Sequence, residues 1–217
     1  MSYGAARKLT SRQLNANLRR ALKQSEGKRV VNSRVLKENL LKSSDERVLE
    51  EVVKHFVVMG EKGDVKIKLF LNRCASEKFN KNSNSRFKIL VRFRELAKKG
   101  DSFGLKGLLV GVRDSNKHHR EYALRGLSLL AAKGETRTLP GLLHGVKDSS
   151  EYNRGWALLG LRELSKKGEK GILPGLLVGV KDFSKYNRGI ALSSLRELAE
   201  RGSVEAKKAL KELGEVI

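Results

Sequence analysis

Two columns of charged residues recur along the chain at one constant step, the step from Asp114 to Asp148. The columns are Asp114, Asp148 and Asp182, and Arg86, Arg120, Arg154 and Arg188. Carboxylate and guanidinium groups can pair with each other, or either can bind an external ligand. The apolar positions around Arg154 centre near it on a helical wheel, and a partly buried arginine needs an acidic partner. We therefore predict a structural ladder of Asp–Arg pairs that tethers repeats, with direct ligand contact as the alternative.

The chain carries far more cations than this ladder can use. Its 217 residues hold 46 Lys and Arg against 24 Asp and Glu, a net charge of +22. Fifteen of the 22 surplus charges fall in residues 1–29 and 64–100. Basic blocks of this kind are typical of nucleic-acid contacts, although a merely solvated face is the alternative. The predicted nucleic-acid-binding residues are Arg7, Lys8, Arg12, Arg19, Arg20, Lys23, Lys66, Lys68, Arg73, Lys88, Arg92, Arg94, Lys98 and Lys99.

The spacing of these cations favours a polyanionic partner. Lys88 and Arg92 are four positions apart, as are Arg94 and Lys98, and like charges at this spacing destabilise a helix when they are unpaired. A polyanion would neutralise them. Aromatic residues are few and no base-reading motif is present, which favours contact with the phosphate backbone of duplex DNA or structured RNA. A chromatin-associated and a ribosome-associated protein both fit.

Few residue patterns in the chain could support catalysis. His55 and His144 are isolated, Cys74 is the single cysteine, and no paired carboxylates or nucleophile–base set is present. We therefore expect no catalytic residue, no metal site, no cofactor and no small-molecule substrate. No window approaches about 18 consecutive apolar residues. We also expect no membrane partner, and a soluble protein of the cytoplasm or of the nucleoid or nucleus.

The recurring residues imply the elements that position them. Gly100 and its equivalents at the same step each close a stretch such as RELAKKG, as expected at a helix C-terminus. After Arg154, apolar or small residues at +3, +4, +7, +10 and +11 form one helical face. Runs such as GLLVGV predict a second, shorter helix whose paired glycines permit close packing. The predicted fold class is all-α, a right-handed α-solenoid of about five 34-residue helical hairpins.

One pattern within these repeats is shared with a known family. Asp148 lies eight positions after Pro140 and six before Arg154, and the same spacing recurs in the next repeat, from Pro174 onward. This pattern resembles the HEAT repeat, in its short, HEAT-like (PBS-lyase-type) form. Two repeats depart from it, since Asn80 replaces the aspartate in one and Lys106 replaces the proline in another. The resemblance implies a curved scaffold that binds partners, and no single function.

Three functions follow from the charge and the resemblance together. The leading hypothesis is a non-catalytic scaffold that binds nucleic acid. The alternative is an adaptor for an acidic protein partner, because HEAT scaffolds commonly bind proteins. A remote alternative is a DNA glycosylase built on HEAT-like repeats, for which Trp156 and Glu163 are the faint candidate residues.

The domain organisation predicted from these patterns has two parts. Residues 1–29 are expected to form a basic arm or helix, and residues 30–217 to form the repeats. The expected boundaries are 30–63, 64–100, 101–134, 135–168 and 169–202, followed by a capping helix over 203–217. Residues 65–79 are expected to form the first helix of the 64–100 repeat.

Overall fold

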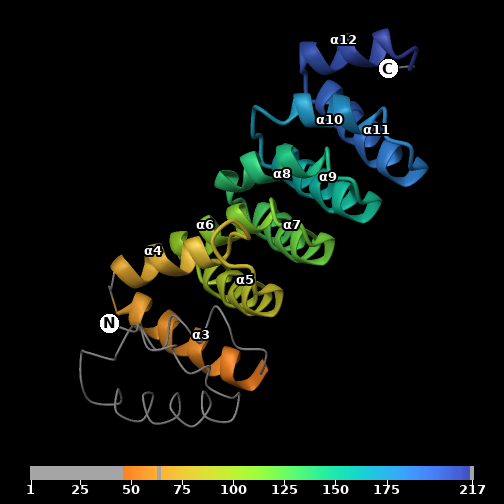
Figure 1. The fold of residues 1–217 in the computed structure, drawn as a ribbon. Helices are drawn as coiled ribbons and strands as arrows, with labels where there is room; N and C mark the ends of the chain where they lie inside the picture. Colours follow the sequence, from red (N-terminus) through yellow and green to blue (C-terminus); the bar gives the residue numbers. More distant parts are fainter. Residues whose placement is uncertain (1–45, 63–64, 216–217) are drawn as a thin grey trace, which may run out of the picture. The chain divides into compact units, whose positions relative to one another are not determined.

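The computed structural model describes residues 46–62 and 65–215, and all of its regular structure is helical. The α-helices are α3 (Glu46–Glu61), α4 (Val65–Cys74), α5 (Ser83–Lys98), α6 (Ser102–Gly111), α7 (Lys117–Ala132), α8 (Leu139–Gly145), α9 (Glu151–Lys166), α10 (Leu173–Gly179), α11 (Lys185–Glu200) and α12 (Val204–Glu212) (Figure 1). The described ranges contain no strand, which confirms the predicted all-α class. No helix in them is long and apolar enough to cross a membrane. The predicted arm over 1–29 and the predicted first helix of the 30–63 repeat lie outside these ranges.

The chain forms two compact units, residues 1–92 and 93–217, and the division falls within α5. In the described part of the first unit, α3 packs against α4. Phe56 of α3 meets Phe70 of α4 edge to face, with ring centroids 5.5 Å apart. Both helices contribute fully buried apolar side chains, so this pair has a core of its own.

The second unit consists of paired helices in sequence order (Figure 1). The short helices α6, α8 and α10 pack against the long helices α7, α9 and α11 that follow them. The long helices also pack on one another, α7 on α9 and α9 on α11, and α12 packs on α11. The apolar positions counted from Arg154 form the core here, since Ala157, Leu158 and Leu161 are completely buried.

The glycines of the short helices lie where a side chain would not fit. A Cβ atom added at Gly141 would lie 2.5 Å from Leu127, and one added at Gly145 would lie 2.4 Å from Leu124. Gly175 is equally close to its neighbour Leu161, at 2.4 Å. Because Cβ atoms essentially never lie this close to a nonbonded carbon, the leucines would have to shift to admit one. The close helix packing predicted from the paired glycines is therefore confirmed.

The helix ends follow local capping residues. Asp101 accepts a hydrogen bond from the backbone N–H of Phe103 at 2.6 Å at the start of α6, and Glu135 accepts from Arg137 in the same way one repeat later. α6 begins directly after its cap, whereas α8 begins only at Leu139. There Pro140 lies in the first turn of the helix, after a short 3-10 turn over Thr136–Thr138. The closing glycines have positive φ, for example 84° at Gly100, as a helix stop requires.

Two of the predicted helices are shorter than expected. The helix predicted over 65–79 ends at Cys74, where the backbone carbonyl accepts a hydrogen bond from the Asn80 side chain at 3.0 Å. The capping helix predicted over 203–217 ends at Glu212 and is followed by Gly214, whose φ is 72°. Backbone turns therefore end both helices before their amphipathic pattern does.

Candidate nucleic-acid interface

The Asp and Arg columns form ion pairs between successive repeats of the second unit. The Arg120 Nε atom donates to Asp148 Oδ2 at 2.6 Å, and its Nη2 atom donates to Oδ1 at 3.0 Å. Arg154 binds Asp182 in the same way, at 2.6 and 2.9 Å. Each pair links one repeat to the next and carries a largely buried carboxylate. The geometry confirms the predicted ladder for these two rungs.

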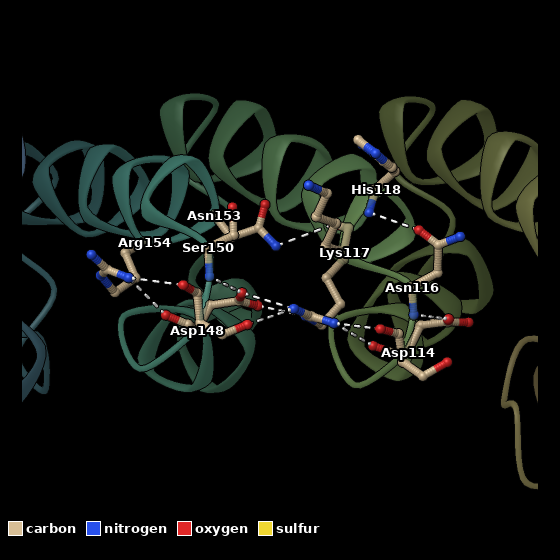
Figure 2. A network of polar contacts seen from close by, with 11 residues as sticks. Asp114, Asn116, Lys117, His118, Asp148, Ser150, Asn153 and Arg154 are labelled. Carbon is tan, nitrogen blue, oxygen red and sulfur yellow. Dashed lines mark hydrogen bonds and ion pairs between the residues drawn. The ribbon is translucent and has the colours of Figure 1, made fainter.

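Each ladder arginine also fastens the turn of its own repeat. The Nη1 atom of Arg154 donates to the backbone carbonyls of Asp148 and Ser149 at 3.0 and 3.4 Å. The Asp148 carboxylate accepts from the backbone N–H of Ser150 at 2.8 Å (Figure 2). Asp148 and Arg154 therefore close the turn of their own repeat. Asp148 also pairs with the preceding repeat, and Arg154 pairs with the next one.

The same contacts hold the ladder aspartates in their ionised form. Hydrogen bonds from Arg154 hold the pKa of Asp182 below its ordinary value against the opposing effect of burial. Burial raises the pKa of Asp148, but the hydrogen bonds from Arg120 and Ser150 outweigh it and the net shift is downward. These carboxylates are occupied by the protein itself, which assigns them a structural role.

Asn80 shows which part of the aspartate's role survives without charge. Its side-chain oxygen accepts from the backbone N–H of Asn82 at 3.0 Å, as Asp148 does from Ser150. Its own carbonyl accepts from Arg86 Nη1 at 2.8 Å, and Arg86 is 2% exposed. The closed turn is therefore kept in the repeat that departs from the family pattern.

The basic residues of α5 are partly engaged within the protein. Arg92 Nη2 lies 3.2 Å from the Glu50 carboxylate, and the Arg94 guanidinium lies over the Tyr122 ring, 4.5 Å from its centroid. The expectation that these arginines lack intramolecular partners is therefore wrong. The partners belong to other helices, α3 for Arg92 and α7 for Arg94, beyond the reach of a comparison at helical spacing. The predicted cations Lys98 and Lys99 are exposed at the end of the helix.

The remaining predicted binding residues lie on α4, on α5 or in the predicted arm. On α4, Lys66 is exposed, Lys68 is half-buried, and Arg73 lies over the Phe79 ring, 4.6 Å from its centroid. Lys88 on α5 is half-buried. The arm residues lie outside the part of the chain that the structure describes: Arg7, Lys8, Arg12, Arg19, Arg20 and Lys23.

A second set of exposed cations follows the turns between the short and long helices of the second unit. We call this set the turn row: Arg113, Lys117, Lys147, Lys181 and Lys185. Over the described ranges, no carboxylate lies within ion-pair distance of any of the five; Arg113 bonds only a backbone carbonyl, that of Leu109 at 3.3 Å. None of these five residues is among the nucleic-acid-binding residues predicted from the sequence. The sequence does contain a pattern that could have indicated three of them, because a cation directly precedes each ladder aspartate.

An aromatic cleft of about 360 Å³ lies between α9 and α11. It is lined by Glu151, Tyr152, Gly155, Trp156, Leu159, Tyr186 and Asn187. Tyr152 is 78% exposed and Tyr186 is 66% exposed, so these two rings lie outside the core. The Arg125 guanidinium lies over the Trp156 ring, 5.2 Å from its centroid.

The cleft does not bring together the two residues considered for a glycosylase. Its acidic residue is Glu151, whereas Glu163 is absent from the lining and accepts from Lys166 Nζ at 2.7 Å. Trp156 and Glu163 therefore do not form the expected site.

No known protein family and no curated protein matches the sequence. The resemblance to HEAT-like repeats therefore stays a prediction from the residue spacing.

Proposed function

We propose that the chain is a non-catalytic nucleic-acid-binding scaffold of HEAT-like repeats that contacts the phosphate backbone of duplex DNA or structured RNA. In this proposal the helical pairs continue as a right-handed α-solenoid of about five hairpins. Chromatin or the ribosome, in the nucleus, nucleoid or cytoplasm, would supply such a partner.

One observation carries the proposal: the turns hold acidic groups that are buried and paired, next to cations that are exposed and have no acidic partner. The carboxylates of Asp148 and Asp182 are largely buried and bind Arg120 and Arg154 of the protein itself. The turn row beside them is exposed and has no carboxylate partner in the described part. Cations left uncompensated in this way attract a polyanion, because binding releases its condensed counterions.

The repeat of the turn row suits an extended polyanion. Packed helices lie about 8–10 Å apart, so equivalent cations such as Arg113, Lys147 and Lys181 are separated by steps of similar size. Successive cations would then contact different phosphates along one backbone. Contacts of this kind fix position and carry no sequence information.

The salt dependence of binding tests the proposal. We expect the full chain to bind both a duplex DNA and a hairpin RNA in fluorescence anisotropy, with log K falling steeply as log salt rises. Neutralising about eight phosphates on B-DNA would give a slope near −7. An affinity that is undetectable, or that does not change with salt, would rule the proposal out.

A second candidate function is supported by the aromatic cleft. Tyr and Trp side chains around an apolar hollow are typical of protein interfaces. Here Tyr152 and Tyr186 are exposed, and the half-buried Trp156 lines the hollow between them. An adaptor that holds an acidic protein through this cleft would lose its partner on Tyr152→Ala and Tyr186→Ala substitution. Binding to nucleic acid by the turn row would persist in the same variant.

A further inference from the structure

Arg188 follows Arg154 in the arginine column, and it repeats only half of the ladder geometry. Its Nη1 atom donates to the backbone carbonyls of Asp182 and Phe183 at 2.7 and 3.0 Å, as Arg154 does in the preceding turn. In Arg120 and Arg154, the Nε and Nη2 atoms hold the aspartate carboxylate of the next repeat. The corresponding position for Arg188 is Val216, which has no carboxylate.

The outer edge of the Arg188 guanidinium therefore has no acidic partner among the residues that the structure describes. Its orientation is nevertheless fixed, because two backbone carbonyls hold the other edge. A planar guanidinium fork in a fixed position binds a carboxylate or phosphate with little further loss of side-chain entropy. In Arg120 and Arg154, the same edge of the guanidinium donates to both oxygens of one carboxylate at 2.6–3.0 Å.

The surroundings of Arg188 favour a more strongly charged anion than an aspartate. Three positions before Arg154 stands Glu151, whereas three positions before Arg188 stands Lys185. Lys181 is exposed on the same turn, and the Asp182 carboxylate already binds Arg154. The local charge around the open fork is thus positive.

Phe183 adds an aromatic surface at the same place. It occupies the position of Ser149 in the preceding turn, its backbone carbonyl accepts from Arg188, and it is 97% exposed. A phenylalanine this exposed contributes nothing to the core. Exposed aromatic rings beside phosphate-binding cations are the usual platform for unpaired bases.

We propose that Arg188 binds one phosphate group of a nucleic acid and that Phe183 stacks on an unpaired base attached to that phosphate. This inference rests on the proposed function and adds an anchor point at which a strand end or an extruded nucleotide is held. The turn row, by contrast, contacts the phosphate backbone without requiring an unpaired base.

A titration of the full chain with inorganic phosphate, observed by ¹⁵N NMR of the arginine Nε–H groups, tests the fork. Chloride at matched ionic strength is the control. We expect the Arg188 signal to shift and saturate, while Arg120 and Arg154, whose forks are filled, stay unchanged. Arg188→Lys keeps the charge but removes the fork, and we expect it to lose the saturable phosphate binding that isothermal titration calorimetry detects in the parent. No saturable shift at Arg188, or equal shifts at all three arginines, would overturn the proposal.

The Phe183→Ser variant tests the stacking, since it restores the residue type of the preceding turn. We expect about a tenfold loss of affinity for a 5′-phosphorylated dinucleotide, with the inorganic phosphate titration unchanged. Equal dinucleotide affinity in the variant would contradict stacking. Saturation of Arg188 by acetate at lower concentration than by phosphate would overturn the proposal in favour of an acidic protein.

The outcome separates this inference from the proposed function. Phosphate binding at Arg188 without duplex or hairpin binding by the chain would refute the scaffold and leave the fork intact. Salt-dependent nucleic-acid binding that is unchanged by both Arg188→Lys and Phe183→Ser would refute the inference and leave the scaffold intact.

Discussion

Each turn of the second unit contains two sets of charged residues that lie side by side in the sequence and differ in direction. The ladder residues face the protein, where Arg154 and Asp182 meet at 2.6 Å with a largely buried carboxylate. The turn-row cation Lys181 directly precedes Asp182, is exposed, and has no carboxylate partner in the described ranges. The residue type alone therefore does not distinguish a structural charge from one that is available for binding. The difference is whether the fold already provides the charged group with a partner.

The sharpest test of this difference is the loss of one inward-facing arginine. Arg154→Ala removes the partner of the buried Asp182 carboxylate and two backbone anchors. We expect the free energy of unfolding to fall by about 3 kcal/mol or more, measured by urea denaturation. Lys147→Ala, at an outward position, should stay within about 0.5 kcal/mol of the parent. Equal losses in the two variants would erase the comparison.

Glycines extend the same contrast to uncharged positions. Gly175 faces Leu161 and has no room for a methyl group, whereas a Cβ atom at Gly189 would meet nothing within 4 Å. We expect Gly175→Ala to destabilise the protein by about 1–3 kcal/mol through overpacking. Gly189→Ala should stabilise it by about 1 kcal/mol, because alanine favours the helix. Thermal and urea denaturation of both variants measure the two signs, and a stabilised Gly175→Ala would contradict the packing.

The pH dependence of stability reports on the inward carboxylates. Hydrogen bonds from Arg154 lower the pKa of Asp182 in the folded protein below the unfolded value of about 3.9. The stabilisation is therefore complete above that unfolded value and is lost as the pH falls through the lower, folded pKa. Urea denaturation from pH 6 downward should show a shallower acid-side loss for Asp182→Asn than for the parent. Parallel curves would show that Asp182 titrates normally.

Much of the fold follows from the sequence because the repeats restate the same local rules. The closing glycines, the paired glycines of the short helices and the apolar face after Arg154 each fix a local feature that recurs from repeat to repeat. The rungs could also be predicted, since two columns that share one step must lie at a constant separation.

The candidate site could be predicted only in part, because accessibility depends on contacts between residues distant in sequence. The partners of Arg92 and Arg94 are Glu50 and Tyr122, which lie on other helices and far away in the sequence. Asp148 binds Arg120 of the preceding repeat, and the adjacent Lys147 is exposed to solvent. The helical spacing within one segment does not reveal this contact between repeats. Local patterns thus locate charges, and tertiary packing decides which are available.

The salt slope of nucleic-acid binding by a turn-row variant tests the central claim most directly. Replacing Lys117, Lys147 and Lys181 together by Gln removes three exposed charges without touching the ladder, and Lys166→Gln, whose lysine already pairs with Glu163, serves as the control. We predict that the slope of log K against log salt on duplex DNA becomes shallower by about 2.7, or 0.9 for each phosphate contact, while the control keeps the parental slope. An unchanged slope and affinity in the triple variant would contradict the claim that these cations exist to meet phosphate.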